Sequence, residues 1–113
     1  MVIAIVTIKA SVDKSGELRE ALSSLSGPTE AERGCESSHL YQDVSDATVL
    51  RIESRWKTED DLLRHIRSDI YKEFLFLLEL SSERPTIEFY KVSEMRGLDL
   101  IWEARNPAGC DPA

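Results

Sequence analysis

The segment from Val2 to Ala10 constrains the fold of this 113-residue chain more than any other. Its sequence, VIAIVTIKA, is rich in β-branched residues and predicts a strand. The first half is apolar at every position, which predicts that both faces of the strand are covered. A layer of helices covers only one face of a sheet. A second copy of the chain is the economical cover for the other face, so we expect a homodimer.

A helix follows this strand. Asp13 or Ser15 is expected to cap its start, and Gly27-Pro28 is expected to end it. Its leucines and one alanine recur at the i, i+3, i+4 and i+7 spacing of a single buried stripe, which consists of Leu18, Ala21, Leu22 and Leu25.

Two strands come next and predict an antiparallel hairpin, because only a short turn separates them. They are Cys35 to Val44 and Ala47 to Trp56, and the second alternates more clearly. One face of that strand is expected to carry Val49, Arg51, Glu53 and Arg55. The other face is expected to carry Leu50, Ile52, Ser54 and Trp56.

The next segment predicts two consecutive helices. Thr58 caps the first helix, and Asp61 three residues later takes the place of the Glu or Gln of a capping box, with a shorter side chain. Ser68, together with Asp69, is expected to start the second helix, which runs to about Leu80. Its FLFLL run is apolar nearly all round, which predicts contacts on more than one side.

The remaining segments complete an α+β fold. Thr86 to Val92 predicts a fourth strand, and Leu98 to Ala104 predicts a short extra strand near the C-terminus. The order β-α-β-β-α-β is typical of a ferredoxin-like fold, a four-stranded antiparallel sheet with helices on one face. We expect a single domain over residues 1–105 and a flexible tail over residues 106–113.

Composition argues against several classes of protein. The net charge is −7, from 21 acidic and 14 dispersed basic residues, whereas a nucleic-acid binder needs a basic patch. No apolar run approaches the roughly 20 residues of a membrane span, and the apolar start lacks the features of a signal peptide, so we expect a cytoplasmic protein. Cys35 and Cys110 have neither metal-ligand nor disulfide spacing and predict two unconnected, reduced thiols.

Several short motifs, taken with this order of elements, point to a known family. They are Gly34-Cys35 entering the second strand, Leu40-Tyr41-Gln42-Asp43 along it, Trp56 closing the third strand, and His65-x-x-Ser68-x-x-Tyr71 followed by Phe74. Together they resemble the antibiotic biosynthesis monooxygenase (ABM) domain of the dimeric ferredoxin-like superfamily. The resemblance covers roughly residues 2 to 95. The appendage from Gly97 to Ile101 resembles a branch of candidate quinol monooxygenases.

The resemblance implies a dimeric α/β barrel, in which two subunits pack sheet to sheet and each holds a pocket between its sheet and helices. Such enzymes oxygenate polycyclic or dihydroxy-aromatic substrates without flavin, haem or metal. We therefore expect a cofactor-independent monooxygenase acting on quinol-like or polyphenolic aromatics. The protein binds the aromatic, accepts a proton and excludes water.

His65 is the expected catalytic residue, because it matches a family histidine that lines the pocket. An imidazole exchanges protons near neutral pH and suits a proton acceptor. The alternative is a structural histidine that interacts with the negative end of its helix dipole.

Four aromatic side chains are expected to bind substrate. Trp56 is either a pocket wall or part of the core, and these roles are not exclusive. Tyr71 and Phe74 match family positions near the pocket, and an interior packing role is the alternative. His39 shares a strand face with Tyr41, which forms either a polar pocket wall or an exposed surface.

Two other functions stay open. The first is a non-catalytic dimeric module that binds small hydrophobic ligands or belongs to a stress response. The second is a haem-binding or haem-degrading relative. Those relatives carry an Asn on the first strand, whereas here Thr7 is the only polar residue before Lys9.

Overall fold

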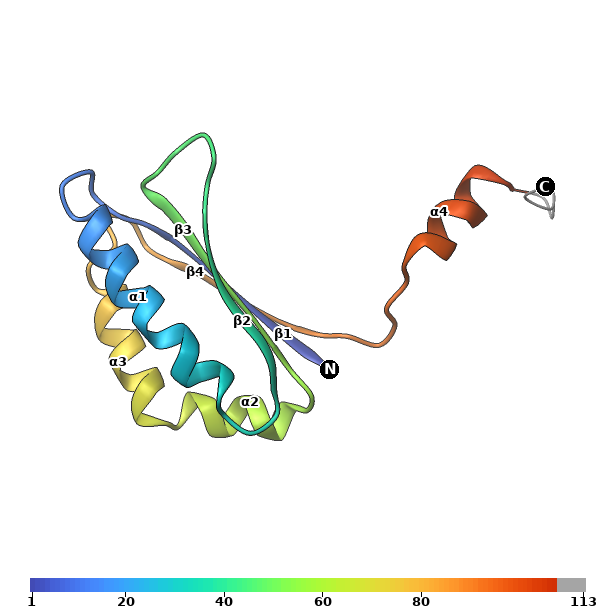
Figure 1. Cartoon of the computed structure of the whole chain (residues 1–113), viewed down its shortest axis with the longest axis horizontal. Coiled ribbons are helices and arrows are strands. Elements are labelled where there is room, and N and C mark those ends of the chain that lie inside the picture. Colours follow the sequence, from blue (N-terminus) through green and yellow to red (C-terminus); the bar gives the residue numbers. More distant parts are fainter. Residues whose placement is uncertain (108–113) are drawn as a thin grey trace.

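A computed structural model describes residues 1–107 and contains one four-stranded antiparallel sheet with helices on one face (Figure 1). This confirms the ferredoxin-like fold, with the second helix broken in two. The predicted C-terminal tail lies mostly outside the described residues. In chain order the elements are β1 (Val2–Lys9), α1 (Ser15–Glu30), β2 (Cys35–Gln42), β3 (Val49–Trp56), α2 (Glu59–Ile66), α3 (Asp69–Leu78), β4 (Thr86–Lys91) and α4 (Leu98–Arg105).

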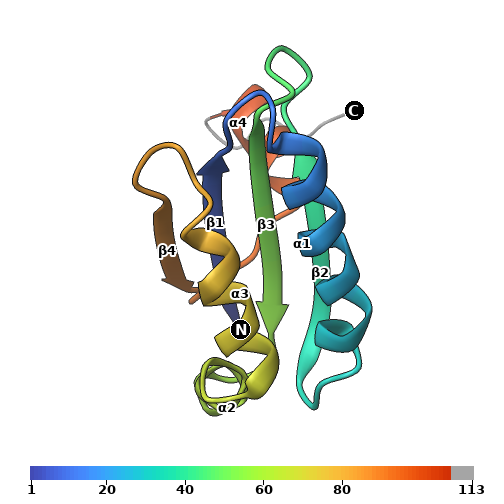
Figure 2. The same cartoon turned by 90° about the vertical axis from the view of Figure 1, so that its left-hand side faces the viewer.

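The strands lie in the order β2-β3-β1-β4, and α1 and α3 cover the same face of the sheet (Figure 2). The register of β1 with β3 runs from Val2 opposite Trp56 to Lys9 opposite Val49. Residues opposite one another in adjacent strands point to the same face. The register therefore decides which side chains meet the helices.

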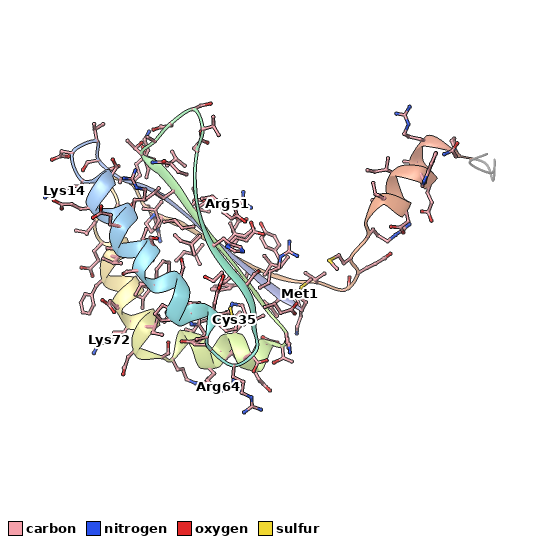
Figure 3. All side chains as sticks on the ribbon, viewed as in Figure 1. Met1, Lys14, Cys35, Arg51, Arg64 and Lys72 are labelled. Atoms are coloured by element: carbon pink, nitrogen blue, oxygen red, sulfur yellow. The ribbon has the colours of Figure 1, made fainter. Side chains whose placement is uncertain are left out.

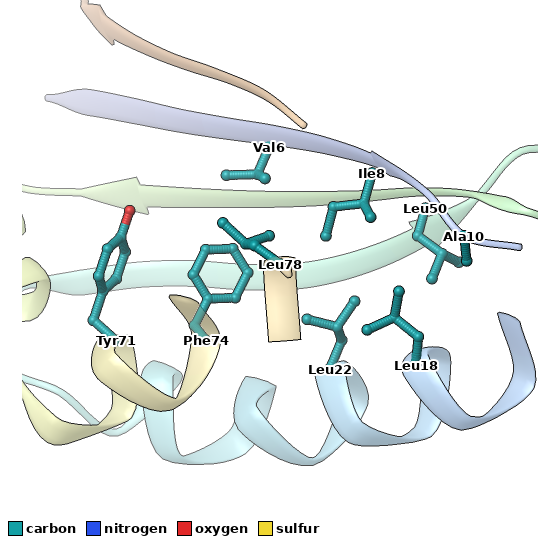
Figure 4. Packing of buried hydrophobic residues seen from close by; sticks show 9 residues of the cluster. All are labelled: Val6, Ile8, Ala10, Leu18, Leu22, Leu50, Tyr71, Phe74 and Leu78. Atoms are coloured by element: carbon teal, nitrogen blue, oxygen red, sulfur yellow. The ribbon is translucent and has the colours of Figure 1, made fainter. Parts of the chain in front are cut away.

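The helix-covered face of the sheet carries the main hydrophobic core (Figure 4). Every second residue of β1 is buried there, and the residues between them are half-buried except for Lys9. Helices α1 and α3 place their apolar stripes on top, and burying each large aliphatic side chain contributes about 1.5–3 kcal/mol. The core residues shown are Val6, Ile8, Ala10, Leu18, Leu22, Leu50, Tyr71, Phe74 and Leu78.

Both ends of α1 differ from the prediction. The helix begins after Lys14 without a side-chain cap, so neither Asp13 nor Ser15 has the predicted role. It also continues through Gly27-Pro28 to Glu30. Proline removes one backbone hydrogen bond, yet Thr29 in the final turn is buried.

The predicted caps of α2 and α3 are confirmed. Thr58 Oγ1 accepts a hydrogen bond from the backbone N–H of Asp61 at 3.1 Å. Ser68 Oγ accepts one from the N–H of Tyr71 at 3.2 Å and donates to the carbonyl of His65 at 2.6 Å. One hydroxyl therefore ends α2 and starts α3.

The segment after Gly97 is the helix α4 and not the predicted strand. A short apolar run does not distinguish helix from strand by itself. Arg96 bonds both Asp99 and Glu103 at 2.7 Å, which ties together successive turns of this helix. All of α4 is exposed and it stands away from the sheet (Figure 1). Among the helices of residues 1–107, none has the length and apolar character to cross a membrane.

The second face of the sheet is uncovered within residues 1–107. On β3, Arg51 and Arg55 point to this face and lie 3.3 and 3.8 Å from Glu53. Figure 3 shows Arg51 on the side of the sheet away from the helices. Ile3 and Ile5 of β1 lie half-buried beside this charged row. The face therefore combines apolar side chains with paired charges.

Candidate functional site

A cavity lies between the sheet and the helices, above a row of small side chains. Ser38, Ser54 and Ala4 are opposite one another on three adjacent strands, and Phe89 ends the row on β4. All four line the cavity. Because the side chains of this row are small, they leave a space between the sheet and the helices. The volume open to the centre of a water molecule is about 40 Å³, which is room for a few waters.

Helices α2 and α3 provide the wall opposite this row. His65 comes from α2, and Tyr71 and Phe74 come from α3. The rings of Tyr71 and Phe74 are 5.4 Å apart (Figure 4). Burial raises the pKa of the Tyr71 hydroxyl, which keeps it neutral and able to donate a hydrogen bond. Tyr71 and Phe74, both expected to bind substrate, therefore lie where a ligand in the cavity would contact them.

The imidazole of His65 is held between two aromatic rings. Trp56 stacks on one face, with ring centroids 4.5 Å apart and an interplanar angle of 25°. Tyr71 meets it edge-on, with centroids 5.1 Å apart. The His65 side chain is only 10% exposed. These contacts fix the plane of the ring at the cavity wall.

Trp56 supports His65 from behind and has no exposed surface. Its Nε1–H donates to Ser54 Oγ at 3.0 Å. The indole therefore belongs to the core, and it orients two groups that line the cavity, His65 and Ser54. In this arrangement Trp56 acts on a substrate through His65 and Ser54 and does not touch it directly.

Glu32 is the member of this site that the sequence did not indicate. Its Oε2 lies 2.6 Å from Nδ1 of His65, although the two residues are 33 positions apart. An ionised carboxylate only accepts hydrogen bonds, so the hydrogen in this contact is assigned to Nδ1 of His65. Nε2 then carries the lone pair. Glu32 lies in the loop after α1, and no periodicity in the sequence predicts where such a loop side chain points.

Gly34 sets how closely this loop approaches α2. Its φ of +84° lies in the left-handed region that favours glycine, and an added Cβ would overlap the side chain of Asp61. The backbone N–H of Lys57 donates to the carbonyl of Gly34 at 2.9 Å. The loop that carries Glu32 is therefore packed directly against the start of the helix that carries His65.

His39 is not brought to the cavity. Its neighbour Ser38 lines the cavity, and the alternation of β2 turns His39 to the opposite face of the sheet. The His39 side chain is 57% exposed, 4.0 Å from Glu30 and in edge contact with Tyr41. Its expected role in substrate binding does not agree with this position.

Two serines bring hydroxyl groups to the sheet side of the cavity. Ser38 and Ser54 are 4% and 6% exposed, and both line it. Ser54 was expected on the same strand face as Leu50, Ile52 and Trp56, and a small polar residue in an apolar stripe is the signal that marks such a site.

The cavity does not resemble a metal or haem site. Across residues 1–107, no group of three or more His, Cys, Asp or Glu side chains lies close enough together to hold a metal ion. A porphyrin is much larger than a space for a few water molecules. Haem binding here would require α1 and α3 to separate from the sheet.

Solved structures of several proteins share this fold. A candidate antibiotic biosynthesis monooxygenase from Deinococcus radiodurans is 23% identical, with a TM-score of 0.78 over 86% of this chain and 97% of that one. A second candidate, from Nitrosomonas europaea, is 20% identical, with a TM-score of 0.76 over 83% and 100%. A conserved protein from Methanosarcina mazei is 31% identical, with a TM-score of 0.73 over 80% and 92%. Among curated protein sequences, none matches.

The sequence also matches a family model. The model named Antibiotic biosynthesis monooxygenase covers residues 1–75, a stretch that runs from β1 into α3 and includes Glu32, Trp56, His65, Tyr71 and Phe74. The match therefore contains most of the cavity and covers more than half of the chain. Family and fold agree, and the chain belongs to the antibiotic biosynthesis monooxygenase family.

Proposed function

We propose that this protein is a cofactor-independent monooxygenase that acts on quinol-like or polyphenolic aromatic substrates. The observation that carries the proposal is the cavity with the imidazole of His65 in its wall. Tyr71 and Phe74 beside it suit the faces of an aromatic ring, and the hydroxyls of Ser38 and Ser54 suit its oxygen substituents. Family membership supports the class of reaction, and the substrate class is our inference.

The proposed reaction uses the electrons of the substrate itself. His65 accepts the proton of a substrate hydroxyl, and the electron pair of the broken O–H bond stays on the aromatic oxygen. The electron-rich phenolate then reduces O₂. One oxygen atom enters the ring and the other leaves in water, so quinol and O₂ give hydroxyquinone and water without an external reductant. The protein orients the aromatic and excludes solvent.

Substrate entry requires the cavity to widen. Phe89 lines the cavity from β4 and is 47% exposed, so its side chain lies between the cavity and solvent. Phe89→Ala is expected to lower KM for two-ring polyphenols more than for one-ring quinols. Equal effects on both would argue against entry beside Phe89.

Oxygen uptake with a panel of quinols and polyphenols tests the function. Wild type is expected to consume O₂ with at least one of them. In His65→Ala, kcat is expected to fall by about 10²- to 10⁴-fold, the usual contribution of a general base. His39→Ala is the matched control, compared at a concentration at which both variants are dimers, because His39 lies outside the cavity on the other face of the sheet. Equal rates in wild type and His65→Ala would remove His65 from the mechanism.

The apolar side chains that line the cavity also support one alternative, a module that binds small hydrophobic ligands without turnover. Such a module needs the apolar walls but not His65. A ligand-dependent rise in Tm without oxygen uptake, unchanged in His65→Ala, would favour this alternative. Product formation would count against it.

We further propose that the active form is a homodimer packed through the uncovered face of the sheet, and that it works in the cytoplasm. The half-buried Ile3 and Ile5, flanked by paired charges, support this interface. Sedimentation at micromolar concentration is expected to give a dimer, and Ile5→Glu a monomer. Val12→Glu, which places the same charge on a residue that is already 84% exposed, is expected to stay dimeric. A monomeric wild type would contradict the proposal.

A further inference from the structure

We infer that Glu32 is a positioning residue for His65. Its carboxylate holds the imidazole in the tautomer that carries hydrogen on Nδ1 and presents the lone pair of Nε2. The inference deepens the proposed function, because it explains how this histidine becomes a proton acceptor. The positioning itself does not depend on which substrate the protein uses.

The contact between the two residues has the geometry of a charge-assisted hydrogen bond. Nδ1 of His65 and Oε2 of Glu32 are 2.6 Å apart. The side chains are 10% and 20% exposed, so little water competes for either group. Such bonds are shorter and stronger than bonds between neutral groups. The fixed carboxylate acts only as an acceptor and therefore selects one imidazole tautomer.

The surrounding rings prevent the imidazole from turning away from Glu32. Trp56 stacks on its face and Tyr71 closes its edge. A flipped ring would exchange a carbon for Nδ1 in the contact and leave the partly buried Glu32 carboxylate without this hydrogen bond. Because Nδ1 is hydrogen-bonded to Glu32, Nε2 is the ring nitrogen that can accept a proton from a ligand in the cavity.

Glu32 also compensates the charge that catalysis creates. When Nε2 accepts the substrate proton, the imidazolium forms beside a carboxylate, which stabilises it in a site with little water. The oxygen atom that leaves as water then takes the proton from Nε2, so an O–H bond forms as the N–H bond breaks. This restores the lone pair of Nε2, while Nδ1–H stays bonded to Glu32 throughout.

Long-range ¹H–¹⁵N NMR correlations of the two histidine rings test the positioning directly, because they report which nitrogen carries the hydrogen. In wild type we expect neutral His65 in the Nδ1–H form, with exposed His39 as an internal reference. Glu32→Ala is expected to shift His65 toward the Nε2–H form that free histidine prefers. Glu32→Met keeps the length of the side chain if Glu32→Ala does not fold. A variant that retains the Nδ1–H form would overturn the inference.

Kinetics test the consequence for catalysis. Glu32→Gln keeps the shape of the side chain but loses its charge, and we expect kcat to fall by about 10- to 100-fold while KM stays within about 2-fold. Glu32→Asp is expected to recover part of the activity. Glu36→Ala, which removes an exposed carboxylate nearby, is the control and should behave as wild type. An unchanged kcat in Glu32→Gln would overturn the catalytic role.

The two readouts separate failure of this inference from failure of the proposed function. If wild type consumes no O₂ with any quinol, the function fails, but the NMR experiment still decides the role of Glu32. If wild type is active and the tautomer is the same in all variants, the function stands and the positioning role fails.

Discussion

The imidazole of His65 stacks on the indole of Trp56, with ring centroids 4.5 Å apart. Trp56 is the last residue of β3, and His65 lies in the last turn of α2. The contact therefore holds α2 against the end of the sheet. It also gives the proposed proton acceptor a rigid support, so stability and site geometry depend on the same pair of rings.

Removing the indole should strongly destabilise the fold. Trp56 has no exposed surface, and truncating a buried Trp to Ala costs about 3–5 kcal/mol. Trp56→Ala is expected to lose that amount in urea unfolding at matched protein concentration. Trp102→Ala is the control, because Trp102 is 57% exposed on α4 and its loss should change stability by less than about 0.5 kcal/mol. Similar losses in both variants would show that Trp56 is not the anchor described above.

Gly34 should not tolerate a side chain. Gly34→Ala puts Cβ on a residue with φ of +84° and into Asp61, and the left-handed conformation alone costs about 1–2 kcal/mol. We expect at least this loss of stability in denaturant unfolding, with a change in the NMR signals of His65. Gly16→Ala is the control, because Gly16 lies in α1 with open space around it and Ala favours a helix by about 0.5–1 kcal/mol. A neutral Gly34→Ala would mean that the loop and α2 are not tightly packed.

Cys35 should react slowly with alkylating reagents in the folded protein. Burial, and then nearby carboxylates, raise the pKa of its thiol from 9.0 to about 11, and only the thiolate is nucleophilic. In a Cys110→Ser background, alkylation of native protein at pH 8 is expected to be on the order of 10- to 100-fold slower than in urea.

The same shift of the Cys35 pKa predicts how stability depends on pH. The folded state favours the protonated thiol, so the stabilisation is complete below pH 9 and is lost as pH rises toward 11. Cys35→Ser should flatten this part of the stability profile. Equally fast alkylation of folded and unfolded protein would contradict both expectations.

The hydroxyl of Ser68 should matter to the site as well as to stability. Ser68→Ala removes the cap of α3 and the bond to the carbonyl of His65, and we expect a loss of about 1 kcal/mol. Thr58→Ala removes a similar cap at the other end of α2 and should cost about the same. Oxygen uptake should fall only in Ser68→Ala, because only that bond involves the His65 backbone. Equal activity in both variants would count against this difference.

Much of the fold could be predicted because β-strand alternation and helix caps are local signals. Val49 to Trp56 alternate as expected, and Thr58 and Ser68 cap the helices they were predicted to start. The end of α1 and the identity of α4 could not be predicted in this way. In α1, Pro28 does not end the helix, and Thr29 after it is buried. In α4, the ion pair between Arg96 and Glu103 favours a helix, and the segment is too short for its apolar spacing to distinguish helix from strand.

The site was only partly predictable, because some of its residues lie on regular helices and strands and one lies in a loop. The positions of Tyr71 and Phe74 follow from helical spacing, and that of Ser54 follows from strand alternation. The contact between His65 and Glu32 depends on a loop whose path is set by Gly34, and no local pattern encodes it. Strand alternation also excludes His39 once Ser38 is known to face the helices.

The row of Ser38, Ser54 and Ala4 has a consequence for how such a protein can evolve. The three positions lie on different strands, and the sheet is held together by backbone bonds that their side chains do not make. A larger residue at any of these positions therefore leaves the pairing of the strands unchanged, although a change at Ser54 also removes the acceptor of the Trp56 Nε1–H. Lineages that share this backbone can diverge in the size of molecule they accept by changing three codons.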